Sequence, residues 1–268
     1  MSESRLAPTW RALGARGRTA LIPYLTAGYP DRPTSLDALR VADGLTDIIE
    51  VGVPFSDPLA DGPTIQRSTF EALRQGMTLR GTLELVRQAQ LNKPVVLFTY
   101  LNPVLRYGVE RFLWDAAELG AAGLLLTDVP AGGDPHVEGL VERSPLDFIR
   151  LVAPTTPPER MPTVLTGASG FVYLIARLGV TGATTALATD LGESVARVRR
   201  ATTLPIAVGF GISTPAQARA VAELADGVVV GSALVDVLGR EGVAGAERFL
   251  GGLREAIDAG AGVGGMPA

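Results

Sequence analysis

Two carboxylic acids lie eleven residues apart in the segment IIEVGVPFSDPLADGP, residues 48–63. The first, Glu50, follows two isoleucines and precedes a valine, a pattern typical of a buried strand. Burial at a cavity mouth should raise the pKa of Glu50, because desolvation disfavours the charged form, and so suit it to acid–base catalysis near neutral pH. The structural alternatives are an ion pair for Glu50 and a helix cap or turn for Asp61, the second acid.

Scarce residue types exclude several other kinds of chemistry. The 268 residues include no cysteine, one histidine and one lysine. A multi-histidine metal site is impossible, a Ser-His-Asp triad would need His136, and a Schiff base would need Lys93. His136 lies in the polar segment AGGDPHVEGL, where we expect a solvated side chain, and Lys93 precedes an apolar run at the end opposite the expected site. The scarcity of these residues therefore favours catalysis by carboxyl groups, without metal or imine.

Two glycine-containing segments near the C-terminus could bind a phosphate. GFGIST (209–214) and VGSALV (230–235) each follow an apolar run and precede a helical pattern. Glycine lets the backbone approach an anion, and the N–H groups of a helix N-terminus favour negative charge. Tight turns into helices are the alternative for either segment taken alone.

Two further groups of residues could complete a site. GVTGATTALATD (179–190) could close over a substrate, or it could be a loosely ordered connection. Tyr24, Tyr100 and Tyr173 lie at or near the ends of apolar runs and could line a pocket for a flat ring, or fill the core.

These residues need a scaffold that brings strand ends together. Near-continuous apolar runs separated by helical patterns are typical of parallel strands that are covered on both faces. Eight runs in about 250 residues predict a (β/α)8 TIM barrel, a single domain over residues 1–259 with a flexible Gly-rich tail at 260–268. An open doubly wound sheet is the alternative. The runs are residues 20–25, 46–53, 94–100, 121–128, 147–154, 170–176, 205–210 and 226–231.

Local patterns place two of the helices between these strands. Apolar residues recur at helical spacing over residues 79–91, and Thr214 to Gln217, with Pro215 at the first helical position, forms a capping-box pattern.

Overall composition limits the partners and the location. A net charge of −4 and a pI near 5.2 make nucleic acid an unexpected partner. No apolar run approaches the roughly 18 residues of a membrane helix, and the N-terminus lacks the apolar segment of a signal peptide. The absence of cysteine suits a reducing compartment, so we expect a cytoplasmic protein.

The motifs, taken together and in order, resemble one known family. EVGVPFSDPLADGPTIQ, with PYLTAG before it and GVTG, GFGIS and VGSA after it, is similar to the tryptophan synthase alpha subunit over essentially the whole chain. The resemblance implies a lyase of tryptophan biosynthesis, which cleaves indole-3-glycerol phosphate by a retro-aldol reaction to indole and glyceraldehyde 3-phosphate.

The resemblance also implies a role for individual residues. Glu50 would move protons at the indole C3 and glycerol hydroxyl positions, Asp61 would hold the indole N–H, and Tyr173 would lie near the reacting centre. Phosphate would bind at Gly182, Gly211, Gly231 and Ser232, and the indole ring would lie against Tyr24, Tyr100 and Leu126. The similarity is poorest at residues 183–190 and at Leu178, so the lid and any contact from Arg177 are not implied.

A partner follows from the resemblance as well. The family implies a beta subunit that carries pyridoxal phosphate, in an alpha2-beta2 heterotetramer, with segments Pro54 to Asp57 and Asn102-Pro103 as candidate contacts. Three alternatives remain at this point: a stand-alone indole-releasing lyase, a phosphosugar isomerase or epimerase barrel, and a non-catalytic activating subunit.

Overall fold

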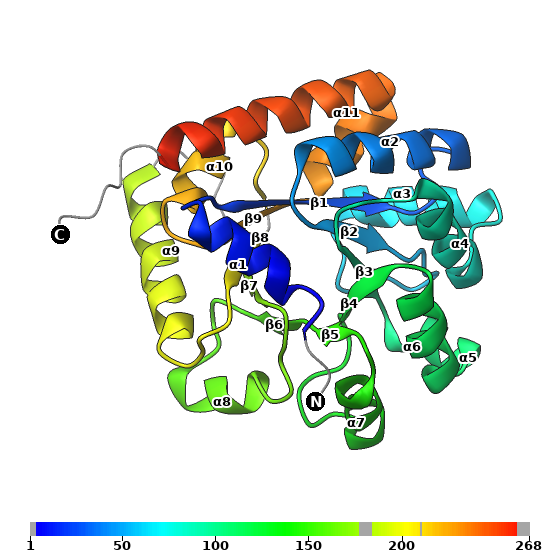
Figure 1. Cartoon of the computed structure of the whole chain (residues 1–268), viewed down its shortest axis with the longest axis horizontal. Helices are drawn as coiled ribbons and strands as arrows, with labels where there is room; N and C mark the ends of the chain where they lie inside the picture. Colours follow the sequence, from blue (N-terminus) through cyan, green and yellow to red (C-terminus); the bar gives the residue numbers. More distant parts are fainter. Residues whose placement is uncertain (1–3, 177–183, 210, 262–268) are drawn as a thin grey trace.

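The computed structural model describes residues 4–176, 184–209 and 211–261. Within these residues, nine parallel strands form one sheet in the order β5-β4-β3-β2-β1-β9-β8-β7-β6 (Figure 1). The strands are β1 (Ala20–Thr26), β2 (Ile49–Gly52), β3 (Val95–Thr99), β4 (Ala121–Leu126), β5 (Asp147–Phe148), β6 (Arg150–Val152), β7 (Val172–Ile175), β8 (Ile206–Gly209) and β9 (Gly227–Val230).

The two strands at the ends of this order are halves of one predicted strand. β5 and β6 are separated only by Ile149, whose N–H donates to the carbonyl of Leu124 at 2.9 Å. β5 pairs with β4, and β6 pairs with β7. The sheet therefore curls into a nearly closed barrel, which confirms the predicted TIM-barrel fold and rules out the open sheet.

Helices alternate with the strands and surround the barrel (Figure 1). They are α1 (Ala7–Ala15), α2 (Arg32–Leu45), α3 (Pro63–Arg74), α4 (Leu79–Ala89), α5 (Leu101–Tyr107), α6 (Val109–Glu118), α7 (Pro135–Arg143), α8 (Met161–Val164), α9 (Thr184–Arg199), α10 (Pro215–Ala222) and α11 (Ser232–Ala261), with a 3-10 turn at Pro158–Arg160. No helix in the described ranges is long and apolar enough to cross a membrane.

Helix boundaries follow local chemistry. The predicted capping box at α10 is present: the Thr214 side chain accepts the N–H of Gln217, and the Gln217 side chain accepts the N–H of Thr214. α4 ends two residues before the predicted limit, where Gln90 adopts a left-handed conformation with φ 52°. α11 continues to Ala261, so the chain is helical at the first two residues of the predicted tail; the remainder lies outside the described residues.

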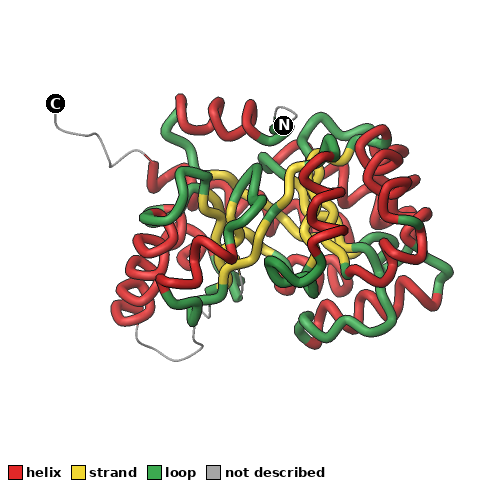
Figure 2. Tube along the Cα trace, turned by 90° about the horizontal axis from the view of Figure 1, so that it is seen from below, coloured by secondary structure: helices red, strands yellow, loops and turns green. Residues whose placement is uncertain are grey.

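Two layers of apolar side chains hold the barrel. The larger layer joins outward-facing strand residues such as Ile49 and Val51 to helix residues such as Leu39 and Leu83. The smaller layer fills the barrel interior and includes Trp10 of α1, whose ring lies 5.6 Å from that of Phe171. α1 thus packs against the ends where the strands begin, and Figure 2 shows it to one side of the strands. The rim at the carboxyl ends of the strands is not covered by α1 and could hold a functional site.

Candidate active site

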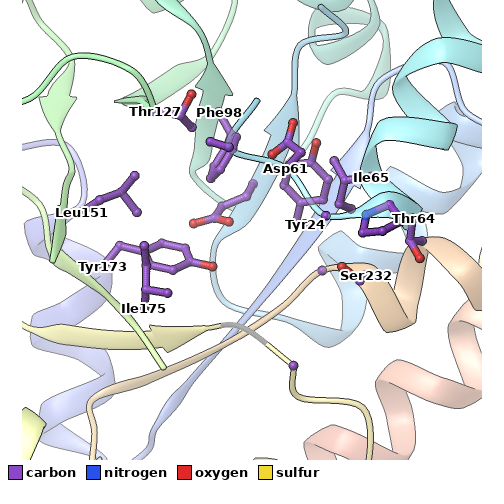
Figure 3. Close-up of a pocket in the computed structure, with 16 residues that line it drawn as sticks. Tyr24, Asp61, Thr64, Ile65, Phe98, Thr127, Leu151, Tyr173, Ile175 and Ser232 are labelled. Atoms are coloured by element: carbon purple, nitrogen blue, oxygen red, sulfur yellow. The ribbon is translucent and has the colours of Figure 1, made fainter. Parts of the chain in front are cut away.

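A cavity of about 370 Å³ opens at the carboxyl ends of the strands. Parallel strands end at the same rim of a barrel, so residues far apart in the sequence meet there. Figure 3 shows Leu151, Tyr173 and Ile175 on one side of this cavity, with Asp61 and Tyr24 facing them. The lining consists of Tyr24, Glu50, Ala60, Asp61, Gly62, Pro63, Thr64, Ile65, Phe98, Thr127, Leu151, Tyr173, Ile175, Gly211, Gly231 and Ser232.

Glu50 is turned inward by the alternation of β2. Its neighbours Ile49 and Val51 pack toward the helices, so the Glu50 side chain faces the interior, where it is fully buried and lines the cavity. Neither carboxylate oxygen has a hydrogen-bond partner among the described residues. Burial raises the pKa of Glu50 from 4.5 to about 8, so the carboxyl is protonated at neutral pH. The ion-pair alternative is wrong for the described part of the chain.

Asp61 reaches the same cavity from the loop between β2 and α3. Its N–H donates to the carbonyl of Pro58 at 3.1 Å, which makes a turn. α3 has Gly62 as its N-cap and no side-chain cap, so the helix-cap alternative for Asp61 is wrong. Burial raises the pKa of Asp61 to about 6, against the effect of a hydrogen bond with Tyr100. At pH 7 the cavity therefore holds one protonated and one ionised carboxyl.

A polar end of the cavity is formed where β8 and β9 finish. Gly211 has φ 87°, a conformation that favours glycine, and Gly231 follows β9 directly. Ser232 opens α11, where N–H groups without helical partners and the helix dipole favour an anion. Thr64 of α3 lies near Ser232 (Figure 3). No described residue that lines the cavity carries a cationic side chain, so an anion at this end would bind to N–H and hydroxyl groups.

Comparison with known proteins gives the family. Residues 10–254 match the tryptophan synthase alpha chain family. The chain belongs to this family. The tryptophan synthase alpha chain of Acidiphilium cryptum (strain JF-5) is 50% identical over 239 residues, which cover 88% of this chain and 87% of that one.

Solved structures agree with this assignment. Tryptophan synthase subunit alpha from Legionella pneumophila str. Paris matches with a TM-score of 0.88 and 34% identity, covering 96% of this chain and all of that one. A chain of Mycobacterium tuberculosis tryptophan synthase matches with a TM-score of 0.86 and 43% identity, covering 96% and 99%. The predicted family, fold and enzyme class, a lyase of tryptophan biosynthesis, are confirmed.

In this alpha chain, two tyrosines lie across glycines of neighbouring strands. A Cβ at Gly52 would lie 2.0 Å from the hydroxyl oxygen of Tyr24, and a Cβ at Gly209 would lie 2.2 Å from that of Tyr173. Burial, together with the charge of Glu50 or Asp61, raises the pKa of both phenols well above the ordinary value. Both phenols therefore stay neutral, and glycine is required where their hydroxyl groups lie.

The structure brings most of the predicted residues of the alpha chain together. Tyr24, Glu50, Asp61, Tyr173, Gly211, Gly231 and Ser232 line one cavity. Tyr100 lies behind Asp61 and is not part of the lining: its hydroxyl accepts the N–H of Ala60 at 3.0 Å, and its ring lies 5.2 Å from Phe55. Gly182 lies outside the described residues, as does the first part of the predicted lid, residues 179–183; residues 184–190 of the predicted lid begin α9.

The prediction for Leu126 is corrected by the structure. Leu126 and Leu124 belong to the layer between the sheet and the helices, whereas Leu125 faces the interior. Leu126 therefore does not line the cavity. The residues that do so and were not predicted are Ala60, Gly62, Pro63, Thr64, Ile65, Phe98, Thr127, Leu151 and Ile175. Every second residue of a strand faces the same side of the sheet, so alternation counted from an inward residue is the signal that could have found the strand residues in this list.

The lone lysine and the lone histidine of the alpha chain do not line this cavity. The backbone N–H of Lys93 donates to Asp43 at 2.7 Å, just before β3 begins, at the opposite end of the barrel. His136 is exposed on α7. Neither residue is among those that line the cavity.

Proposed function

We propose that this alpha chain cleaves indole-3-glycerol phosphate to indole and glyceraldehyde 3-phosphate by carboxyl acid–base catalysis. One observation carries the proposal: Glu50, fully buried and without a described hydrogen-bond partner, lines the same cavity as Asp61. Burial raises the pKa of Glu50 to about 8 and that of Asp61 to about 6, on opposite sides of neutral pH. Pairs of titratable groups whose environments separate their pKa values are typical of acid–base sites.

Glu50 is the proposed proton carrier. Protonated Glu50 gives its proton to the indole C3, and the resulting carboxylate accepts the proton of the adjacent glycerol hydroxyl. The bond between C3 and the glycerol carbon then breaks, its electrons return to the ring, and the new carbonyl becomes the aldehyde product. The buried, unpartnered state of Glu50 supports this role, because such a carboxyl exchanges protons near pH 7.

Asp61 is the proposed partner of the ring nitrogen. Its ionised carboxylate accepts the indole N–H and stabilises the positive charge that protonation at C3 creates. Tyr24 and Phe98, whose rings lie 5.3 Å apart, provide an apolar wall for the indole together with Leu151 and Ile175. Tyr173 is proposed to lie against the reacting carbons.

The phosphate is proposed to bind at Gly211, Gly231 and Ser232. Their position at the ends of β8 and β9, with the N-terminus of α11, supports this assignment. Gly182 remains proposed for the same role on the resemblance alone. The chemistry uses carboxyl groups throughout, so we propose that this chain carries no cofactor and works in the cytoplasm as one domain over residues 1–259.

A beta subunit that carries pyridoxal phosphate is the proposed partner, in an alpha2-beta2 heterotetramer. The segment Pro54 to Asp57 leads to Leu59, which is 92% exposed, and Phe70 of α3 nearby is 64% exposed. Apolar side chains of this size beside a cavity mouth favour a protein contact. Asn102 is exposed at the same rim and is proposed as a second contact.

Release of indole from indole-3-glycerol phosphate tests the function directly. We expect turnover by the purified chain, a large increase on addition of a beta subunit, and a loss of about 10²–10⁴-fold in Glu50→Gln. Glu71→Gln, at an exposed position of α3, is the matched control and should keep full activity. Unchanged turnover in Glu50→Gln would contradict the proposed catalytic role, and absence of indole release would favour a different phosphosugar reaction.

A further inference from the structure

The cavity has no described cationic side chain, yet a hollow beside it has two. This hollow, of about 480 Å³, shares Thr64, Gly211 and Ser232 with the cavity. Its other lining residues include Arg67 and Arg240. The shared residues belong to the proposed phosphate end, so the positive charge lies next to the place where the dianion would bind.

The two arginines are held by one carboxylate. Arg67 Nη2 lies 3.4 Å from Asp236 Oδ1, and Arg240 Nη2 lies 2.9 Å from Asp236 Oδ2. Arg67 comes one turn after Thr64 on α3, and Asp236 comes one turn after Ser232 on α11. Two cations and one anion leave a net charge of +1 beside the cavity mouth.

The arginine side chains are 58% and 66% exposed, and Asp236 is 39% exposed. At such exposure an ion pair contributes little to folding stability. Unscreened charge beside a cavity instead attracts oppositely charged ligands over the Debye length, which is about 10 Å at 0.1 M salt. We therefore expect the two arginines and Asp236 to affect substrate capture more than folding stability.

We propose that Arg67 and Arg240 form a capture site for the phosphate group of the substrate, and that Asp236 limits its strength. The phosphate dianion meets the arginines first and then passes to the N–H and hydroxyl groups of the Gly231–Ser232 end. The proposal rests on the proposed function, because it assumes that a phosphate monoester enters this cavity. Asp236 keeps the net charge low, so that the phosphorylated product can also leave.

Binding of glycerol 3-phosphate to the full chain, measured by calorimetry, tests the capture site. At about 0.01 M salt we expect Arg67→Gln to weaken binding about three- to tenfold and Asp236→Asn to strengthen it about two- to fivefold. Both differences should vanish at about 1 M salt, where the Debye length falls to about 3 Å. The same variants should change KM for indole-3-glycerol phosphate rather than kcat.

Arg87→Gln is the matched control, because Arg87 is 56% exposed and pairs with Glu84 on α4, away from this hollow. It should leave binding unchanged. Weaker binding in Asp236→Asn, or effects that persist at high salt, would overturn the proposal, since they would reveal a role in position and not in charge. If the unaltered chain binds no glycerol 3-phosphate, the proposed function fails; if it binds but ignores Arg67, only the capture site fails.

Discussion

Glu50→Gln should be more stable than the unaltered protein, and the difference in the free energy of unfolding should grow as the pH rises. Glutamine has the shape of a protonated glutamic acid and does not titrate. Glu50 is fully buried without a described hydrogen-bond partner, and its pKa is raised from 4.5 to about 8. The folded protein therefore binds a proton that the unfolded chain releases above pH 4.5.

The sign and size of the effect follow from this difference. Between pH 4.5 and about 8 the folded state holds more protons, so the unaltered protein loses stability as the pH rises. Each pKa unit corresponds to about 1.4 kcal/mol. The loss reaches about 3 kcal/mol at pH 7 and about 5 kcal/mol above pH 8. Glu50→Gln escapes this loss, so the two proteins should be equally stable near pH 4 and diverge above it.

Urea unfolding of Glu50→Gln and the unaltered protein across this pH range measures the divergence. The exposed Glu71→Gln serves again as the control and should give a constant difference. A constant difference for Glu50→Gln, or a variant that is less stable at pH 8, would refute the reasoning, because it would mean that the folded protein stabilises the carboxylate.

Three further predictions concern other parts of the molecule. kcat/KM should rise through pH 6 and fall above pH 8. Tyr100→Phe should move the acidic limb to higher pH, because the hydrogen bond from Tyr100 lowers the pKa of Asp61 and its loss raises that pKa; a pH–rate profile measures both effects. Glu138→Gln should destabilise the fold by about 3 kcal/mol in urea unfolding, because it leaves a buried guanidinium without its anion. Gly209→Ala should lower kcat about tenfold or more, because its Cβ would displace the Tyr173 hydroxyl; a preserved kcat would contradict this.

The buried ion pair behind the second of these predictions also explains a local pH dependence. Glu138 of α7 pairs with Arg150 of β6 and accepts the N–H groups of Gly132 and Asp134, both at 3.2 Å. Burial alone would raise the pKa of Glu138, but the hydrogen bonds from Arg150, Gly132 and Asp134, together with the charge of Arg150, outweigh burial and lower the pKa. This stability is present above the ordinary glutamate pKa of 4.5 and is lost as the pH falls through the lowered value.

The sequence predicted the strands well because both of their faces are apolar. The same property hides the inner face: in Leu124-Leu125-Leu126 no polar residue marks which side chain turns inward, so the strand pattern offers no check on Leu126, which only the resemblance places in the indole pocket. β2 offered such a mark, since the isolated Glu50 distinguishes the inner face from Ile49 and Val51. The inward-facing side chains of a buried parallel strand can therefore be predicted from sequence only where a polar residue marks the inner face.

Other features depend on contacts across long sequence distances. Arg67 and Asp236 are 169 residues apart, and no local spacing relates them. Tyr100 was expected in the pocket because it ends a strand, yet its hydroxyl binds the Ala60 N–H and supports the loop that carries Asp61. The positions of these side chains depend on how the loops pack across the rim of the barrel. Local residue patterns do not predict that packing.

The lack of a described cation among the residues that line the cavity has a thermodynamic consequence for ligand binding. A phosphate dianion at the Gly231–Ser232 end adds negative charge to the cavity that also holds Glu50, and no described cationic side chain in the lining lies between them. This disfavours ionisation of the Glu50 carboxyl still further. Near and above pH 8, the ligand and one proton should therefore be taken up together. The proposed substrate would thus favour the protonated form of the proposed acid, Glu50, and the measured heat of binding would depend on the buffer that supplies the proton.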